Sequence, residues 1–351
     1  MIDDPLLTEN IGALSRSIKE AQDILESEFF DYHSIQKYIS TLAKLRAGVL
    51  SNESCIYFGN NLKHLSITPG GKPPNILDPE FLSKPLEELP RNCVYFLLNN
   101  DIGNQIELYK SLYNHRPCSL FILWDWDSQH WVEMSCTLAA YSDFYIPVSS
   151  ENSYTIGHLN PFVLGPVFVG VNQWRKDFVI NNIEVLLANR VDDPYGPHVG
   201  YSAYQRRNRA VATLNQKFPH VGFTDNSYKT RTELEVLTEW CGYKAHWIVP
   251  VRSGMPIRLY NCLVTGGIPL VPGFYRYLLE SSDLPPDVMY YDVLDLIEPD
   301  RLVEIANRHF DQQGTDGLTR RVGDFLNRYH IDARCLEILE LLRERVRSLF
   351  K

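Results

Sequence analysis

Two acidic residues follow an apolar stretch in the first half of the chain. The run Phe121–Trp124 is apolar, and Asp125, Asp127 and His130 come directly after it among three tryptophans. If the run is a buried strand of a parallel sheet, these side chains lie at the carboxyl edge, where α/β proteins bind ligands. Asp125, Asp127 or His130 is then a candidate general base that removes a proton from an acceptor hydroxyl. Alternatively, Asp127 caps a helix expected to begin near residue 129.

A second group of candidate residues surrounds a glycine loop in the other half of the chain. Arg252, Ser253 and Gly254 follow an expected strand, and Pro256 begins an expected helix that ends at Gly266-Gly267. Backbone N–H groups are unpaired at the start of a helix. With Arg252 and Arg258 nearby, they can hold an anion such as a diphosphate.

The segment Arg258–Val271 resembles the donor-binding segment of GT-B glycosyltransferases, both exostosin-like and group 1-like. The resemblance rests on an arginine, an apolar pair, a short helix and Gly-Gly-Ile-Pro in that order. It implies that Arg258 approaches the phosphates of the donor. Asn261 stands where this family commonly has a glutamate that holds a ribose or sugar hydroxyl, and an amide can both donate and accept there. Arg252, Ser253, Gly254 and Tyr260 belong to the same expected donor site. The resemblance adds Arg190, expected at the donor phosphates, and His198, expected to touch the donor or the acceptor.

The implied activity is transfer of a sugar from a nucleotide-activated donor to a hydroxyl of a glycan or lipid-linked glycan. No cofactor is expected, since GT-B enzymes stabilise the departing phosphate with positive side chains and a helix N-terminus. The resemblance suggests assembly of bacterial surface polysaccharide, lipopolysaccharide or capsule. It also suggests peripheral association with the inner membrane face or with a polysaccharide-assembly complex.

Several alternatives stay open at this point. Asp125-Trp126-Asp127 also resembles the DxD motif of GT-A glycosyltransferases, which bind Mg²⁺ or Mn²⁺. Because position 261 has asparagine in place of the family's glutamate, the chain can also be a non-catalytic module that binds a sugar or a nucleotide. Arg258–Val271 can also be an ordinary βαβ unit, and the stretch before His198 an ordinary turn, because it is rich in proline, glycine and aspartate.

The elements that must position these residues follow an alternating rhythm. Short apolar runs separated by helical patterns predict parallel strands covered on both faces. The expected strands lie at 93–98, 119–124, 144–148, 163–169, 183–188, 220–223, 245–249, 268–271 and 289–293. We therefore expect an α/β protein of GT-B type, with two Rossmann-like domains, 1–175 on the acceptor side and 176–351 on the donor side, facing across a cleft. Extra helices are expected at both ends of the chain, two of them within 8–48.

Composition narrows the class of protein. The 351 residues include 34 Lys+Arg and 43 Asp+Glu, giving a net charge of −9. The sequence contains no stripe of basic residues, so a nucleic-acid partner is not expected. No two of the seven cysteines lie within four residues of each other, which argues against a zinc knuckle or a CxxC pair. The acidic N-terminus does not resemble a signal peptide, and no apolar run is long enough to span a bilayer. We expect a cytoplasmic protein with reduced cysteines.

Overall fold

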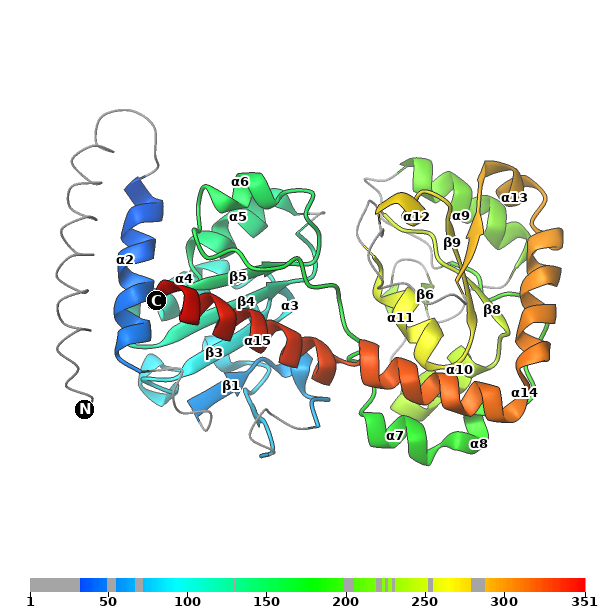
Figure 1. Ribbon diagram of the computed structural model, residues 1–351, viewed down its shortest axis with the longest axis horizontal. Coiled ribbons are helices and arrows are strands. Elements are labelled where there is room, and N and C mark those ends of the chain that lie inside the picture. The colour runs from blue at the N-terminus through cyan, green and yellow to red at the C-terminus, as the bar shows by residue number, and fades with distance from the viewer. Residues whose placement is uncertain are drawn as a thin grey trace. The chain divides into compact units, whose positions relative to one another are not determined.

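The chain forms two compact units in the computed structural model (Figure 1). The structure describes residues 32–48, 55–66, 72–128, 131–197, 205–218, 223–224, 227–228, 231–251, 255–278 and 288–350. The first unit lies within Met1–Asn60, Asn75–Pro166 and Leu341–Lys351, and the second within Asn61–Pro74 and Val167–Glu340. The chain therefore enters each unit more than once.

The first unit is built on a five-stranded parallel sheet with the order β2-β1-β3-β4-β5. Its strands are β1 (Ile56–Phe58), β2 (Asn75–Ile76), β3 (Val94–Leu98), β4 (Leu120–Asp125) and β5 (Phe144–Pro147). Its helices are α2 (Tyr32–Arg46), α3 (Asn99–Ile102), α4 (Ile106–His115), α5 (Val132–Ala140) and α6 (Ser153–Gly157). Every residue of β3, β4 and β5 is buried, as expected for a parallel sheet covered on both faces. The strand order places the topological switch point between β1 and β3.

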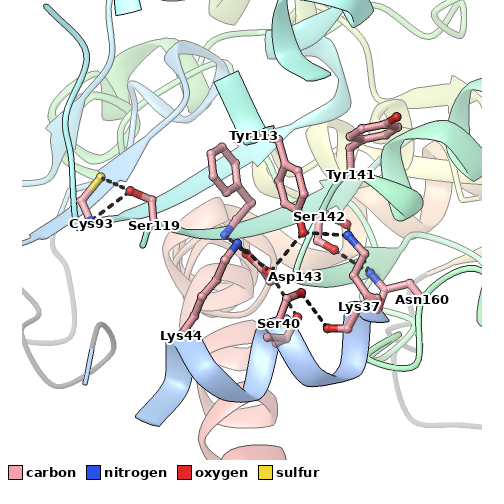
Figure 2. A network of polar contacts seen from close by, with 12 residues as sticks. Lys37, Ser40, Lys44, Cys93, Tyr113, Ser119, Tyr141, Ser142, Asp143 and Asn160 are labelled. Carbon is pink, nitrogen blue, oxygen red and sulfur yellow. Dashed lines mark hydrogen bonds and ion pairs between the residues drawn. The ribbon is translucent and has the colours of Figure 1, made fainter. Parts of the chain in front are cut away.

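A buried charge cluster attaches α2 to this sheet (Figure 2). Asp143, just before β5, accepts hydrogen bonds from Lys44 Nζ at 2.8 and 2.9 Å and from the Phe121 backbone N–H at 2.8 Å. Thr41 and Tyr113 also donate to it, at 3.1 and 3.3 Å. The cluster lies where β4 and β5 begin, at the opposite edge of the sheet from the candidate ligand-binding edge. It therefore serves the fold rather than the site.

The second unit contains a three-stranded parallel sheet with the order β10-β9-β8. Its strands are β8 (Ala245–Trp247), β9 (Ile268–Pro272) and β10 (Met289–Tyr291), and β6 (Phe223–Thr224) pairs separately with β7 (Ser227–Tyr228). Parallel bridges from Val191 to Tyr243 and from Tyr195 to His246 extend the sheet beyond β8. The prediction of an α/β fold with parallel sheets is thus confirmed.

Nine α-helices within the described residues belong wholly or partly to this unit. They are α7 (Lys176–Asn181), α8 (Ile183–Leu186), α9 (Gln205–Lys217), α10 (Glu233–Cys241), α11 (Ile257–Val264), α12 (Tyr275–Leu278), α13 (Val293–Ile297), α14 (Asp300–Tyr329) and α15 (Ile331–Leu349). Figure 1 shows the sharp bend in α14, at Gly314, whose φ is 64°. Such a positive φ favours glycine. The end of α15, from Leu341, is part of the first unit.

Two of the expected strands are wrong, and a third, 220–223, lies outside the described residues except for Phe223, which belongs to the antiparallel pair of β6 and β7. Segment 163–169 contains only an isolated bridge, at Val163, because Gly165 and Pro166 interrupt it and proline lacks the N–H that a ladder requires. Segment 183–188 contains α8, since a short apolar run does not by itself distinguish a strand from a helix. The first of the two helices expected within 8–48 lies outside the described residues.

The described helices include none that is both long and apolar enough to cross a membrane. All seven cysteines are described, and each is a free thiol.

Candidate active site

The first candidate site lies at the carboxyl edge of the sheet in the first unit. Leu98 at the end of β3 pairs with Trp124 of β4, so the residues after both strands meet. Asn99 accepts a hydrogen bond from the Trp126 N–H at 2.9 Å, and its amide donates to Asp127 Oδ2 at 2.7 Å. Asn99 is buried, whereas Asp127 is partly exposed. The arrangement presents one orientated carboxylate at this edge, the geometry that a general base requires.

Asp125 differs from Asp127 because its carboxylate is enclosed. It accepts hydrogen bonds from Ser135 Oγ at 2.6 Å, from the Asp127 N–H at 2.9 Å and from the Tyr145 hydroxyl. Burial raises the pKa of Asp125, and these hydrogen bonds oppose that rise. Asp125 therefore ties β4 to β5 and α5, and its contacts favour a structural role over a catalytic one.

This geometry does not favour the metal-dependent alternative. An Asp-Trp-Asp cation site needs open carboxylate oxygens on both acids, and those of Asp125 are already hydrogen-bonded. Across the described parts of the chain, no three His, Cys, Asp or Glu side chains form a group suited to a metal ion.

The other residues of this segment differ in how far they are exposed. The helix α5 begins at Val132 with Trp131 as its N-cap residue, and Asp127 accepts a hydrogen bond from Asn99. The start of the helix that Asp127 was expected to cap, near residue 129, lies outside the described residues. Trp124 and Trp126 are buried and pack edge to face with ring centroids 5.1 Å apart. Trp131 is 55% exposed, so of these three tryptophans it is the one that can stack on a sugar.

Asp101 fills the neighbouring part of the edge, at the switch point between β1 and β3. Its Oδ2 accepts a hydrogen bond from the Leu98 N–H at 2.8 Å. A Cβ atom on Gly59, which follows β1, would lie only 1.8 Å from the same oxygen. Glycine at position 59 therefore makes room for the carboxylate that caps α3.

The second candidate site lies at the start of α11 in the second unit. This helix begins directly after Pro256, whose extended backbone suits that position. Arg258, in the first turn, donates from Nη2 to the Gly196 carbonyl oxygen at 2.9 Å. Its guanidinium carbon lies 4.6 Å from the ring centroid of Tyr195 and 5.3 Å from that of Trp240. These contacts hold a cation, only partly buried, beside the N-terminus of a helix at the carboxyl edge of the sheet.

Asn261 lies on the same side of α11, three residues after Arg258. It is 1% exposed, and no side-chain hydrogen bond joins its amide to any described residue. A buried amide without partners costs roughly 1–3 kcal/mol, and most such groups in folded proteins are bonded. Because side chains lean towards the start of their helix, Asn261 leans towards the first turn of α11.

The electrostatic surroundings of this site are positive. His246 of β8 is fully buried and stacks on Trp240 with centroids 5.2 Å apart. Burial lowers its pKa well below the ordinary value, and the charges of Arg258 and Arg190 lower it further. His246 is therefore neutral at physiological pH, while the arginines provide the positive potential that an anionic ligand would meet.

Arg190 and Tyr260 do not lie at the start of α11. Arg190 is 9% exposed and donates to the carbonyl oxygens of Leu186, Tyr243 and Thr265, the last at the opposite end of α11, at 2.7 to 3.2 Å. Its contacts hold the end of the helix in place, which does not favour a phosphate-binding role. Tyr260 is 1% exposed and packs against Tyr329 of α14, with centroids 5.1 Å apart.

The remaining predicted site residues lie outside the described residues: His130, His198, Arg252, Ser253 and Gly254. The structure thus brings Arg258 and Asn261 together in the second unit, and places Asp125 and Asp127 at one sheet edge in the first.

Residues that the sequence analysis missed complete both sites. Asn99 directly follows the buried strand β3, so its position at a strand end was a usable signal. Tyr195 and Trp240 enclose Arg258, but their approach depends on folding of segments far apart in the chain.

Comparison with known proteins identifies no family. No family model matches this chain. No curated protein is detectably similar to it in sequence. Among solved structures it is similar to a UDP-forming α,α-trehalose-phosphate synthase from Burkholderia xenovorans, with a TM-score of 0.43 and 10% sequence identity over 76% of this chain and 77% of the other. At this level of similarity, the likeness identifies neither the fold nor the function.

Proposed function

We propose that this chain is a glycosyltransferase of GT-B type, and that its second unit binds the nucleotide-sugar donor at the start of α11. The observation that carries the proposal is the pairing of Arg258 with Asn261. One offers a cation fixed by Gly196, Tyr195 and Trp240, and the other a buried amide without a hydrogen-bond partner among the described residues. A phosphate oxygen suits the guanidinium, and a ribose or sugar hydroxyl suits an amide that can donate and accept.

In this proposal the first unit supplies the general base. Asp127 is partly exposed and Asn99 fixes one of its carboxylate oxygens, so the carboxylate can accept a proton from an acceptor hydroxyl. Trp131 provides an exposed aromatic face for a sugar ring. The departing phosphate is stabilised by Arg258 and the helix N-terminus, without a metal.

The finer assignments belong to the same proposal. The acceptor is a hydroxyl of a glycan or lipid-linked glycan, in assembly of a bacterial surface polysaccharide such as lipopolysaccharide or capsule. The protein acts in the cytoplasm, at the inner membrane face. His198, Arg252, Ser253 and Gly254 complete the donor site, and His130 remains a candidate beside Asp127.

A panel of nucleotides tests the donor site. UDP, GDP, ADP, TDP and CMP are each added in a thermal-unfolding experiment, because a ligand that binds only the native state raises the melting temperature. We expect one nucleotide to bind. Replacing Arg258 by alanine should weaken the binding of that nucleotide about tenfold to a hundredfold, since a hydrogen bond to a charged group contributes about 1.5–3 kcal/mol.

Two variants control for damage to the fold. Arg258→Lys keeps the positive charge and should retain part of the affinity, and Arg276→Ala removes an exposed arginine of the same unit and should retain all of it. Equal affinity of wild type and Arg258→Ala would refute the donor site. Nucleotide binding without sugar transfer from any donor of that nucleotide would indicate a non-catalytic binding module.

A further inference from the structure

A separate feature of the second unit is the exposed apolar surface of α13. Val293 and Leu294 are each 72% exposed and Ile297 is 68% exposed, although the helix has only five residues. Residues three or four apart share a helix face, so the three side chains form one patch. Single exposed aliphatic residues are ordinary, whereas contiguous apolar patches mark interaction sites. We call these three residues the α13 patch.

The fold holds the α13 patch firmly in place. Asp292 caps the helix by accepting from the N–H groups of Leu294 and Asp295, and Asp295 accepts from the Asp292 N–H at 2.9 Å. Leu296, on the opposite side, packs against the hydrophobic core cluster of this unit. The exposed side chains are therefore presented by an ordered element, which lowers the entropy cost of binding.

The charges that α13 and the residues flanking it in the chain carry are mainly negative. Residues 292–301 contain four acidic side chains and one arginine, Arg301. Asp300 forms an ion pair with Lys217 of α9, which leaves Asp292, Asp295 and Glu298 beside the patch. An acidic rim repels anionic lipid headgroups, and it equally disfavours a second copy of the same patch.

We propose that the α13 patch is a docking surface for a basic amphipathic helix of a partner protein. Leucine-type side chains of such a helix would cover Val293, Leu294 and Ile297, and its lysines or arginines would face the acidic rim. An amphipathic helix that lays its apolar face on an apolar surface is a common mode of peptide recognition, and complementary charges around the contact favour the correct partner. This surface is independent of the proposed donor site.

A synthetic helix of leucine and lysine at helical spacing is the probe. Its binding to the full chain is followed by fluorescence anisotropy at low and at high salt, with a leucine–glutamate helix as the control peptide. We expect the leucine–lysine helix, the lysine peptide, to bind the wild-type chain. It should bind the triple variant Val293→Ser, Leu294→Ser, Ile297→Ser about tenfold more weakly. Glu298→Gln should weaken binding mainly at low salt. The matched control, Ile180→Ser with Leu187→Ser, removes exposed apolar side chains elsewhere in the unit and should bind like wild type.

The other outcomes overturn the proposal. Equal binding of the lysine peptide to the triple variant and to wild type would show attraction to the acidic chain in general. A dimer in sedimentation that the triple variant abolishes would identify a second copy as the occupant. Patch-dependent binding to phosphatidylserine vesicles would identify a lipid surface. An unchanged melting temperature of the triple variant is the check that the fold is intact.

Discussion

Lys37 gives the sharpest test of how α2 is attached to the first unit. Lys37 is 4% exposed, and its amine lies 2.8 Å from the Tyr113 hydroxyl and 4.4 Å from the centroid of that ring (Figure 2). Burial lowers the pKa of Lys37 from 10.5 to about 8; Asp143 opposes this shift and Lys44 adds to it. The folded protein therefore binds the proton of Lys37 less tightly than the unfolded chain does, and a charged Lys37 reduces its stability.

The sign of the pH effect follows from proton binding. Between pH 8 and 10.5 the unfolded chain binds more protons at Lys37 than the folded chain, so the contribution of Lys37 to stability rises with pH. Integration from about pH 7 to about pH 9.5 gives an increase of about 2 kcal/mol. Buried thiols lower the stability as the pH rises. Burial raises the pKa of Cys93 and Cys241 to about 11, whereas thiols of the unfolded chain ionise at lower pH.

The variant Lys37→Met separates these contributions. Urea unfolding is measured at both pH values for wild type and variant, and the thiol effects cancel when the two proteins are compared. We expect wild type to gain about 2 kcal/mol relative to Lys37→Met between pH 7 and 9.5. A difference between the two proteins that does not change with pH would refute the account of a buried lysine whose pKa is lowered.

Three further predictions concern other contacts. Asp143→Asn leaves Lys44 buried without its charged partner and should lower the free energy of unfolding in urea by about 3–5 kcal/mol. Asp177→Asn, whose ion pair with Arg175 is exposed, should change it little. A small loss of stability for Asp143→Asn would contradict the role of the cluster. Gly267→Ala should destabilise the protein by about 1–3 kcal/mol, because the added Cβ would lie 2.7 Å from His246 and 2.9 Å from Cys262 Sγ. Gly323→Ala places its Cβ in open space and should not destabilise the protein. Equal melting temperatures of the two variants would refute this prediction. Arg190→Met should lower the melting temperature without a selective loss of nucleotide affinity, since Arg190 bonds the end of α11; a selective loss of affinity would instead place Arg190 in the donor site.

Much of the architecture could be predicted from periodicity. Runs such as Val94–Leu98 are apolar throughout because both faces of a parallel sheet are buried, and this pattern identified the main strands. β1 and β2 were missed because strands of three and two residues carry too little pattern. The return of residues from Leu341 to the first unit was also not visible, because it depends on tertiary contacts.

The candidate site could be predicted from the sequence where it depends on local structure. Arg258 and Asn261 were placed correctly on one helix because proline and glycine mark both of its ends. The surroundings of Asp125 and Arg190 were not predictable, since Tyr145, Ser135 and Thr265 reach them from distant segments. Which polar side chain is enclosed and which is presented is decided by packing, which sequence spacing does not show.

Hydrogen exchange with bound nucleotide tests the central claim most directly. The nucleotide that raises the melting temperature is added to the full chain, and backbone amide exchange is compared with and without it. The account predicts slower exchange at the start of α11, over 257–261, and in the segment that begins at Tyr195 and Gly196. Protection confined to the first unit, or none at α11, would contradict a donor site at Arg258 and Asn261.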